Sequence, residues 1–137
     1  MADVYVASSA NLAKWAEDVG LTKYVYKVGV SEDGAEEAVE ALNEEEFAGQ
    51  TDWKLIKKEK LKDTEEDQLL ERLAGREKTV DPTFYPKIRG AKGIFKVKFV
   101  SVENHVIAKK ALAGDMEKNI RIKPADIGEY LIHNATR

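Results

Sequence analysis

The segment from residue 24 to residue 53 constrains the fold of this chain more than any other. Residues 24–30, YVYKVGV, are β-branched and aromatic, which is typical of a strand. A polar turn follows, and then apolar residues recur at the spacing of one helix face. That face consists of Ala35, Ala38, Val39 and Leu42. A second turn leads to another strand at Trp53, so the segment predicts a strand–helix–strand unit.

The same patterns predict the remaining elements. Further strands are expected over residues 3–7, 53–61, 94–100 and, as a short one, 120–123. Further helices are expected from an N-cap at Ser9 to residue 19, from a capping box at residues 64–67 to residue 74, over residues 102–113, and from Pro124 onward.

This alternation of strands and helices predicts an α/β (α+β-like) fold with a small mixed or antiparallel sheet flanked by helices. One domain is expected over residues 1–137. Its core would cover residues 1–75, followed by a long loop over residues 76–93. A C-terminal strand–helix extension would cover residues 94–137.

Composition narrows the class of function. The net charge is −3, so the chain as a whole is not a strongly basic nucleic-acid binder. No apolar run approaches the roughly 20 residues of a membrane helix, and no membrane partner is expected. The N-terminal residues lack a signal-peptide pattern, and a cytoplasmic location is expected. The chain has no cysteine and two histidines, His105 and His133, which together do not predict a zinc site.

Residues 3–73 resemble the GIY-YIG nuclease superfamily, in particular the branch found in phage and bacterial proteins. Asp3-Val4-Tyr5 stands at the first tripeptide of that family and Lys27-Val28-Gly29 at the second. The runs VGVS, AVEALN and FAGQTDWKL then resemble the turn, helix and third strand of the branch.

The resemblance implies a small sheet flanked by helices and metal-dependent cleavage of a DNA phosphodiester. It implies that Tyr5 and Lys27 stand where tripeptide tyrosines help to activate water. It also implies that Glu66 or Glu71 would hold a divalent metal, Mg²⁺ or Mn²⁺, if the chain is active. No other cofactor is expected. The tyrosines Tyr5, Tyr24 and Tyr26 could cluster at one end of the sheet.

The family's phosphate-binding arginine has no counterpart here. Alignment on Leu42-Asn43 places Ala38 at its position. Residues 28–52 contain no Lys or Arg and nine acids: Glu32, Asp33, Glu36, Glu37, Glu40, Glu44, Glu45, Glu46 and Asp52. Such a surface repels a phosphate backbone, which indicates a catalytically degenerate member.

Positive charge is concentrated in the second half of the chain. Residues 83–110 contain seven basic residues and one acid, Glu103. With the aromatic residues Phe84 and Tyr85, this segment could form a phosphate- or strand-binding surface. The more common explanation of such a pattern is the lysine-bearing outer face of a strand followed by a solvated loop. The candidate nucleic-acid contacts are Lys87, Arg89, Lys92, Lys96 and Lys98.

Three functions are therefore compatible with the sequence. The first is a degenerate GIY-YIG-like domain that binds DNA, RNA or an acidic protein partner without cleavage. The second is a metal-dependent endonuclease that uses Tyr5, Lys27 and Glu66 or Glu71, with Lys54 or Arg72 in place of the arginine. The third is a structural or regulatory protein whose oppositely charged surfaces serve self-association.

Overall fold

The computed structural model describes residues 2–61, 65–80, 93–114 and 122–136, and the fold is given for these. The elements in chain order are β1 (Ala2–Ser9), α1 (Ala10–Asp18), β2 (Val25–Ser31), α2 (Ala35–Glu44), the 3-10 turn η1 (Phe47–Gly49), β3 (Trp53–Leu61), α3 (Glu66–Ala74), β4 (Lys78–Thr79), β5 (Ile94–Lys96), α4 (Phe99–Leu112) and α5 (Pro124–Thr136). The α/β fold class is confirmed.

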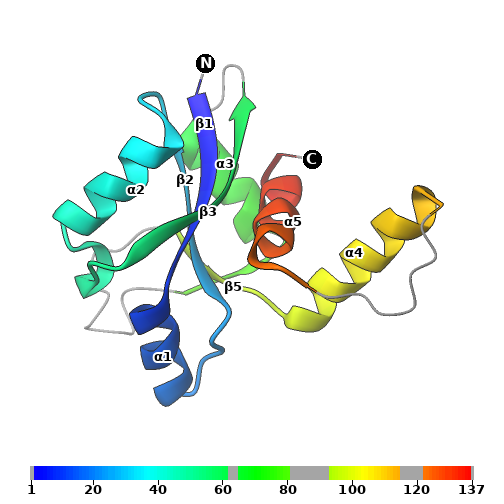
Figure 1. The fold of residues 1–137 in the computed structure, drawn as a ribbon, viewed down its shortest axis with the longest axis horizontal. Coiled ribbons are helices and arrows are strands. Elements are labelled where there is room, and N and C mark those ends of the chain that lie inside the picture. The colour runs from blue at the N-terminus through cyan, green and yellow to red at the C-terminus, as the bar shows by residue number, and fades with distance from the viewer. Residues whose placement is uncertain (1, 62–64, 81–92, 115–121, 137) are drawn as a thin grey trace.

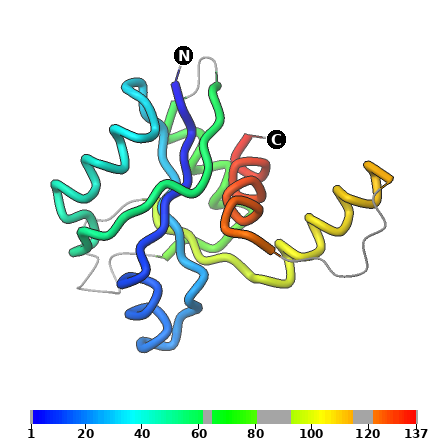
Figure 2. Tube along the Cα trace, in the orientation of Figure 1, coloured from blue at the N-terminus to red at the C-terminus, as the bar shows by residue number. Residues whose placement is uncertain are grey.

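The strands form one sheet in the order β3-β1-β2-β5-β4. Every pair of neighbouring strands is antiparallel, so of the two expected sheet types the antiparallel one is observed. Strands β1 and β2 are adjacent, and Tyr5 lies opposite Gly29 on β2 and opposite Lys58 on β3. The traces of β1 and β3 run side by side through the middle of the molecule (Figure 2).

Helices cover both faces of the sheet (Figure 1). One face carries Val4, Val6 and Phe95, and it packs against α3, α4 and α5. The other carries Tyr5, Val25 and Ile94, and it packs against α1, α2 and η1. Because side chains alternate along a strand, the two cores consist of alternate residues of the same strands.

The local signals in the N-terminal half act as predicted. The Ser9 hydroxyl accepts a hydrogen bond from the Leu12 amide at 3.1 Å and caps α1. The same hydroxyl donates to Asp52, whose carboxylate also accepts from the Asn11 amide at 3.0 Å. Partial desolvation opposes ionisation of Asp52, but these hydrogen bonds hold its pKa below the usual value. Strand β3 has the predicted bounds.

The predicted strand over residues 94–100 is wrong in its second half. Strand β5 ends at Lys96, and α4 begins at Phe99, three residues before the predicted start. The alternation of apolar and basic residues continues past Lys96, but β2 begins only at Val25, opposite Lys96. Beyond that pair the strand has no ladder partner on β2, and the chain turns into a helix after the Val97 amide bonds the Tyr24 carbonyl at 2.8 Å.

Three other boundaries differ from expectation or lie outside the described residues. The N-cap of α3 is Glu65, which makes no side-chain capping bond, and Thr64 lies outside the described residues. In the expected loop over residues 76–93, a short strand β4 and the buried Val80 are present, and residues 81–92 lie outside. Of the expected short strand over residues 120–123, residues 122 and 123 are not in a strand, and residues 120 and 121 lie outside the described residues.

Helix α5 packs closely on β3 because Gly128 allows it. A Cβ at Gly128 would lie 2.5 Å from the Cβ of Lys57. The inner face of this helix includes Ile127, Tyr130 and Leu131, which are buried. Helix α4 extends away from the sheet, and only Val102 and Val106 of it are buried (Figures 1 and 2). None of the helices described has both the length and the apolar character needed to cross a lipid bilayer.

Candidate functional site

The residues that match the two tripeptides meet on the α2 face of the sheet. Tyr5 is 5% exposed, and its ring lies across Gly29, where an added Cβ would be 2.5 Å from the phenolic oxygen. Glycine is thus required at position 29 by the close approach of Tyr5. Lys27 lies two residues earlier on the same face of β2.

Lys27 is buried rather than at a sheet edge. It is 5% exposed, because β2 lies between β1 and β5. Its ammonium lies 5.0 Å from the centroid of the Phe47 ring. Phe47 follows Glu46 and precedes Ala48, both of which have left-handed backbone angles. The chain bends here so that an aromatic ring contacts the buried cation.

Glu66 is brought near Tyr5, and Glu71 is not. Glu66 starts α3, and its carboxylate accepts a hydrogen bond from the Val30 amide at 2.8 Å, at the edge of β2 beyond the end of β5. Glu71 is exposed to solvent. In the ranges that the structure describes, no three His, Cys, Asp or Glu side chains are arranged to hold a metal ion.

The chemistry available to Tyr5 is limited. Burial, together with the negative charges of Glu66 and Glu45, raises the pKa of Tyr5 to about 12. At pH 7 the Tyr5 side chain is therefore neutral. A phenol that is buried and neutral is poorly placed to contact a phosphodiester or to accept a proton from water.

The cation that the family places beside the tyrosine is absent from α2. Ala38, which stands at the position expected for the arginine, packs against the core that contains Tyr5. Lys58, opposite Tyr5 on β3, forms an ion pair with Glu36 of α2. Neither alternative lies beside Tyr5. Arg72 donates to the Ala135 carbonyl of α5 at 3.4 Å. The exposed Lys54 of β3 is opposite Ser8, three residues along β1 from Tyr5.

The acidic surface is exposed as the sequence predicts. Eight of its nine acids face solvent, and Asp52 is partly buried. Asp3 of the first tripeptide is also structural: its carboxylate accepts from the Ala35 amide at 3.0 Å, at the N-terminus of α2. This side of the molecule therefore presents negative charge outward and a packed core inward.

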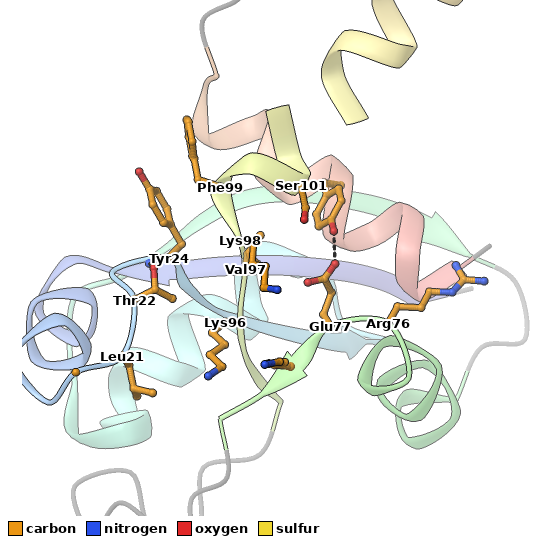
Figure 3. A pocket seen from close by; sticks show the side chains of 13 residues that line it. Leu21, Thr22, Tyr24, Arg76, Glu77, Lys96, Val97, Lys98, Phe99 and Ser101 are labelled. Atoms are coloured by element: carbon orange, nitrogen blue, oxygen red, sulfur yellow. Dashed lines mark hydrogen bonds between the residues drawn. The ribbon is translucent and has the colours of Figure 1, made fainter. Parts of the chain in front are cut away.

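A second, open site lies between the segment that precedes β2, strands β4 and β5, the start of α4, and α5. It is a cleft of about 560 Å³, which is within the usual size range of ligand pockets. We refer to it as the basic cleft (Figure 3). Its lining comprises Gly20, Leu21, Thr22, Tyr24, Arg76, Glu77, Lys78, Lys96, Val97, Lys98, Phe99, Ser101 and Tyr130.

Three lysines of the basic cleft have no carboxylate partner among the described residues. Lys78 and Lys96 are directly opposite each other on β4 and β5, so their side chains leave the same face of the sheet. Like charges in this position are destabilising unless an anion joins them. Lys98 stands at the N-cap of α4, where the positive end of the helix dipole adds to the potential.

The acid in the cleft lining is already engaged. Glu77 accepts a hydrogen bond from the Tyr130 hydroxyl, which is the dashed line in Figure 3. It also accepts one from the Asn134 side-chain amide at 3.1 Å. Burial and then this contact raise the pKa of Tyr130 to about 12. The Arg76 guanidinium donates to the Asn134 carbonyl at 3.1 Å, near the C-terminus of α5. The lysines are thus left to attract an anion.

One end of the basic cleft is aromatic. The rings of Tyr24 and Phe99 are stacked, with centroids 5.1 Å apart and planes inclined by 25°. The ammonium of Lys23 lies 5.4 Å from the Tyr24 centroid. In Figure 3 these two rings lie at one end, Arg76 lies at the other, and Lys96 lies between them. The expected cluster of Tyr5, Tyr24 and Tyr26 is not formed. Tyr24 and Tyr26 pack on one face of the sheet, and Tyr5 packs on the other.

Sequence analysis identified part of this cleft. Lys96 and Lys98 were predicted contacts, and both line it. Lys87, Arg89, Lys92, Phe84 and Tyr85 lie outside the described residues. Lys78 was missed because a two-residue strand leaves no pattern. The Tyr24–Phe99 pair was missed because its members are 75 positions apart and Phe99 was assigned to a strand interior.

Comparison with known protein families, curated proteins and solved structures gives no match to this chain.

Proposed function

We propose that this chain is a GIY-YIG-like domain that binds nucleic acid at the basic cleft and does not cleave it. The observation that carries the proposal is the convergence of three lysines without carboxylate partners, among the described residues, on a cleft that ends in two stacked aromatic rings. Lysines attract the phosphate backbone, and aromatic rings accept base faces.

The alternative location for a phosphate, beside Tyr5, is unfavourable on three counts. Tyr5 is buried, Lys58 is paired with Glu36, and the surrounding surface is acidic. Bringing a phosphodiester there would place like charges together and would require the core around Gly29 to open. We therefore assign the contact to the basic cleft.

Fluorescence anisotropy with a labelled single-stranded oligonucleotide tests the proposal. If the cleft makes about three phosphate contacts, raising the salt concentration from 50 to 200 mM should weaken binding roughly 20-fold. The double variant Lys96→Glu/Lys98→Glu should lose binding for all sequences alike. Lys54→Glu/Lys60→Glu changes the charge equally on β3 and should bind as the parent does. Absence of binding at low salt, or equal loss in both variants, would overturn the proposal.

The endonuclease alternative is tested separately by plasmid nicking. Its physical support is the position of Tyr5 across Gly29 and within electrostatic range of Glu66. We expect no nicking with Mg²⁺ or Mn²⁺. Metal-dependent nicking that Tyr5→Phe abolishes would show instead that this cluster is catalytic.

A second candidate function, self-association, is favoured by α4. Its exposed surface includes large apolar side chains: Val100, Ile107 and Leu112, the last of these 91% exposed. A helix with such residues on its outer side is a candidate contact between copies. Sedimentation over a range of protein concentrations tests this candidate, and Ile107→Glu should keep the chain monomeric if α4 forms the contact.

A further inference from the structure

We infer that the basic cleft takes single-stranded rather than duplex nucleic acid, with one unpaired base stacked on the Tyr24–Phe99 pair. The inference rests on the proposed function and names the form of its ligand. It requires a base to stack on the aromatic pair, whereas the lysines alone suffice for the phosphate contacts of the proposed function.

The aromatic pair has the geometry of a stacking platform. Tyr24 and Phe99 are both partly exposed, and their planes are inclined by only 25°. Their parallel arrangement can be continued by a third flat ring. Tyr24 is held in place through its backbone, because its carbonyl accepts from the Val97 amide at 2.8 Å. The main chain that carries the Tyr24 ring is therefore held before a base arrives, which reduces the entropy lost on binding.

Each ring of the pair directly follows a lysine in the sequence. Lys23 precedes Tyr24, and its ammonium lies 5.4 Å from that ring. Lys98 precedes Phe99 and lines the cleft. A nucleotide whose base stacks on the rings would thus have cations on both sides for its flanking phosphates. Cations with interleaved aromatic rings are the general arrangement of single-strand sites.

A duplex does not fit this arrangement. Bases in a duplex are stacked on one another, so their faces cannot reach an aromatic side chain without unpairing. Groove recognition needs a helix or a β-ribbon that protrudes into the DNA. The stacked pair lies instead in a concave cleft of about 560 Å³, whose size suits one splayed nucleotide.

The test compares a 12-nucleotide single strand with a duplex of the same sequence at low salt. The single strand should bind about 10-fold more tightly or better. Tyr24→Leu and Phe99→Leu should each lower single-strand affinity about 10-fold and leave duplex affinity unchanged. Tyr24→Phe and Phe99→Tyr keep a ring and should retain affinity. Phe47→Leu removes a ring on the opposite face of the sheet and serves as the matched control.

Fluorescence of a 2-aminopurine base in the same strand gives a readout that affinity alone does not. It should be quenched by the parent chain and by Tyr24→Phe, and not by Tyr24→Leu. Equal affinity for both nucleic-acid forms, with the lysine variants still impaired, would overturn this inference and leave the proposed function standing. Binding of neither form would overturn both.

Discussion

The Tyr5 cluster and the basic cleft contain the same kinds of side chain in opposite settings. The first consists of the buried Tyr5 and Lys27, each 5% exposed, and the half-buried Glu66. The second places a tyrosine, lysines and a glutamate around an open cavity of about 560 Å³. Residue identity is therefore a poor guide to function, because exposure decides which groups can meet a ligand.

The two regions also differ in how their charges are balanced. Around Tyr5, Lys58 pairs with Glu36, and the Glu66 and Asp3 carboxylates accept backbone amides. In the cleft, Glu77 is occupied by Tyr130 and Asn134, and three lysines have no carboxylate partner in the parts of the chain described. The charges of the first region are paired within the molecule, whereas the three lysines of the second have no carboxylate partner among the described residues.

The largest expected effect is a loss of stability on disrupting the packing of Tyr5 against Gly29. Gly29→Val inserts a side chain where the Tyr5 ring lies and should lower the free energy of unfolding by about 2 kcal/mol. Denaturant unfolding measures this loss. Adding Tyr5→Leu should recover part of it, because the clash is with that ring. If Gly29→Val is neutral and Tyr5→Leu does not couple to it, the cluster is not packed as described.

A smaller loss of stability is expected at Asp3, whose carboxylate caps the N-terminus of α2. Asp3→Ala removes the acceptor of the Ala35 amide and should cost about 1 kcal/mol of unfolding free energy. Nucleic-acid affinity should not change. Asp3→Asn, which keeps an acceptor oxygen, is the conservative control. A change in affinity without a change in stability would place Asp3 in the binding surface instead.

Glu77→Gln tests whether the charge of the basic cleft controls its affinity for nucleic acid. The amide can still accept from Tyr130, but the negative charge is lost. Affinity for an oligonucleotide should rise a few-fold at low salt, and the gain should shrink as salt screens it. An exposed acid far from the cleft, Glu40→Gln on α2, is the matched control. Unchanged affinity for Glu77→Gln would separate this residue from the ligand.

The smallest effect concerns pH. Burial, with contributions from His133 and Lys109, lowers the pKa of His105, which packs on Tyr130 and His133 between α4 and α5. A lowered pKa means that the unfolded chain binds this proton more readily. The associated stability is present above pH 6.5 and is lost as the pH falls through the folded-state value. His105→Gln should make the thermal midpoint less sensitive to pH below 6.5.

Local patterns predicted most of the fold, and long-range pairing explains what they missed. The helices α1, α2 and α5 were predictable because their signals are local: the Ser9 cap, the apolar face of α2 and Pro124 all act on neighbours within a turn or two. The end of β5 depends instead on where β2 begins. The burial of Lys27 depends on the pairing of β5 with β2, and no residue near Lys27 in the sequence predicts that pairing.

The candidate site was only half predictable for the same reason. The charge of Lys96 and Lys98 is visible in sequence, and both line the cleft. The stacking of Tyr24 on Phe99 and the opposition of Lys78 to Lys96 arise from sheet register. The ion pair between Lys58 and Glu36 is equally non-local, and it neutralises the cation nearest to Tyr5 in register.

Amide chemical-shift mapping during titration with a single-stranded oligonucleotide tests most directly which of the two regions meets nucleic acid. The account predicts that shifts concentrate at Lys23, Tyr24, Lys78 and residues 96–101, around the basic cleft. It predicts little change at Tyr5, Gly29 and α2. Shifts concentrated at Gly29, Ala38 and Glu66, with the cleft unchanged, would contradict it.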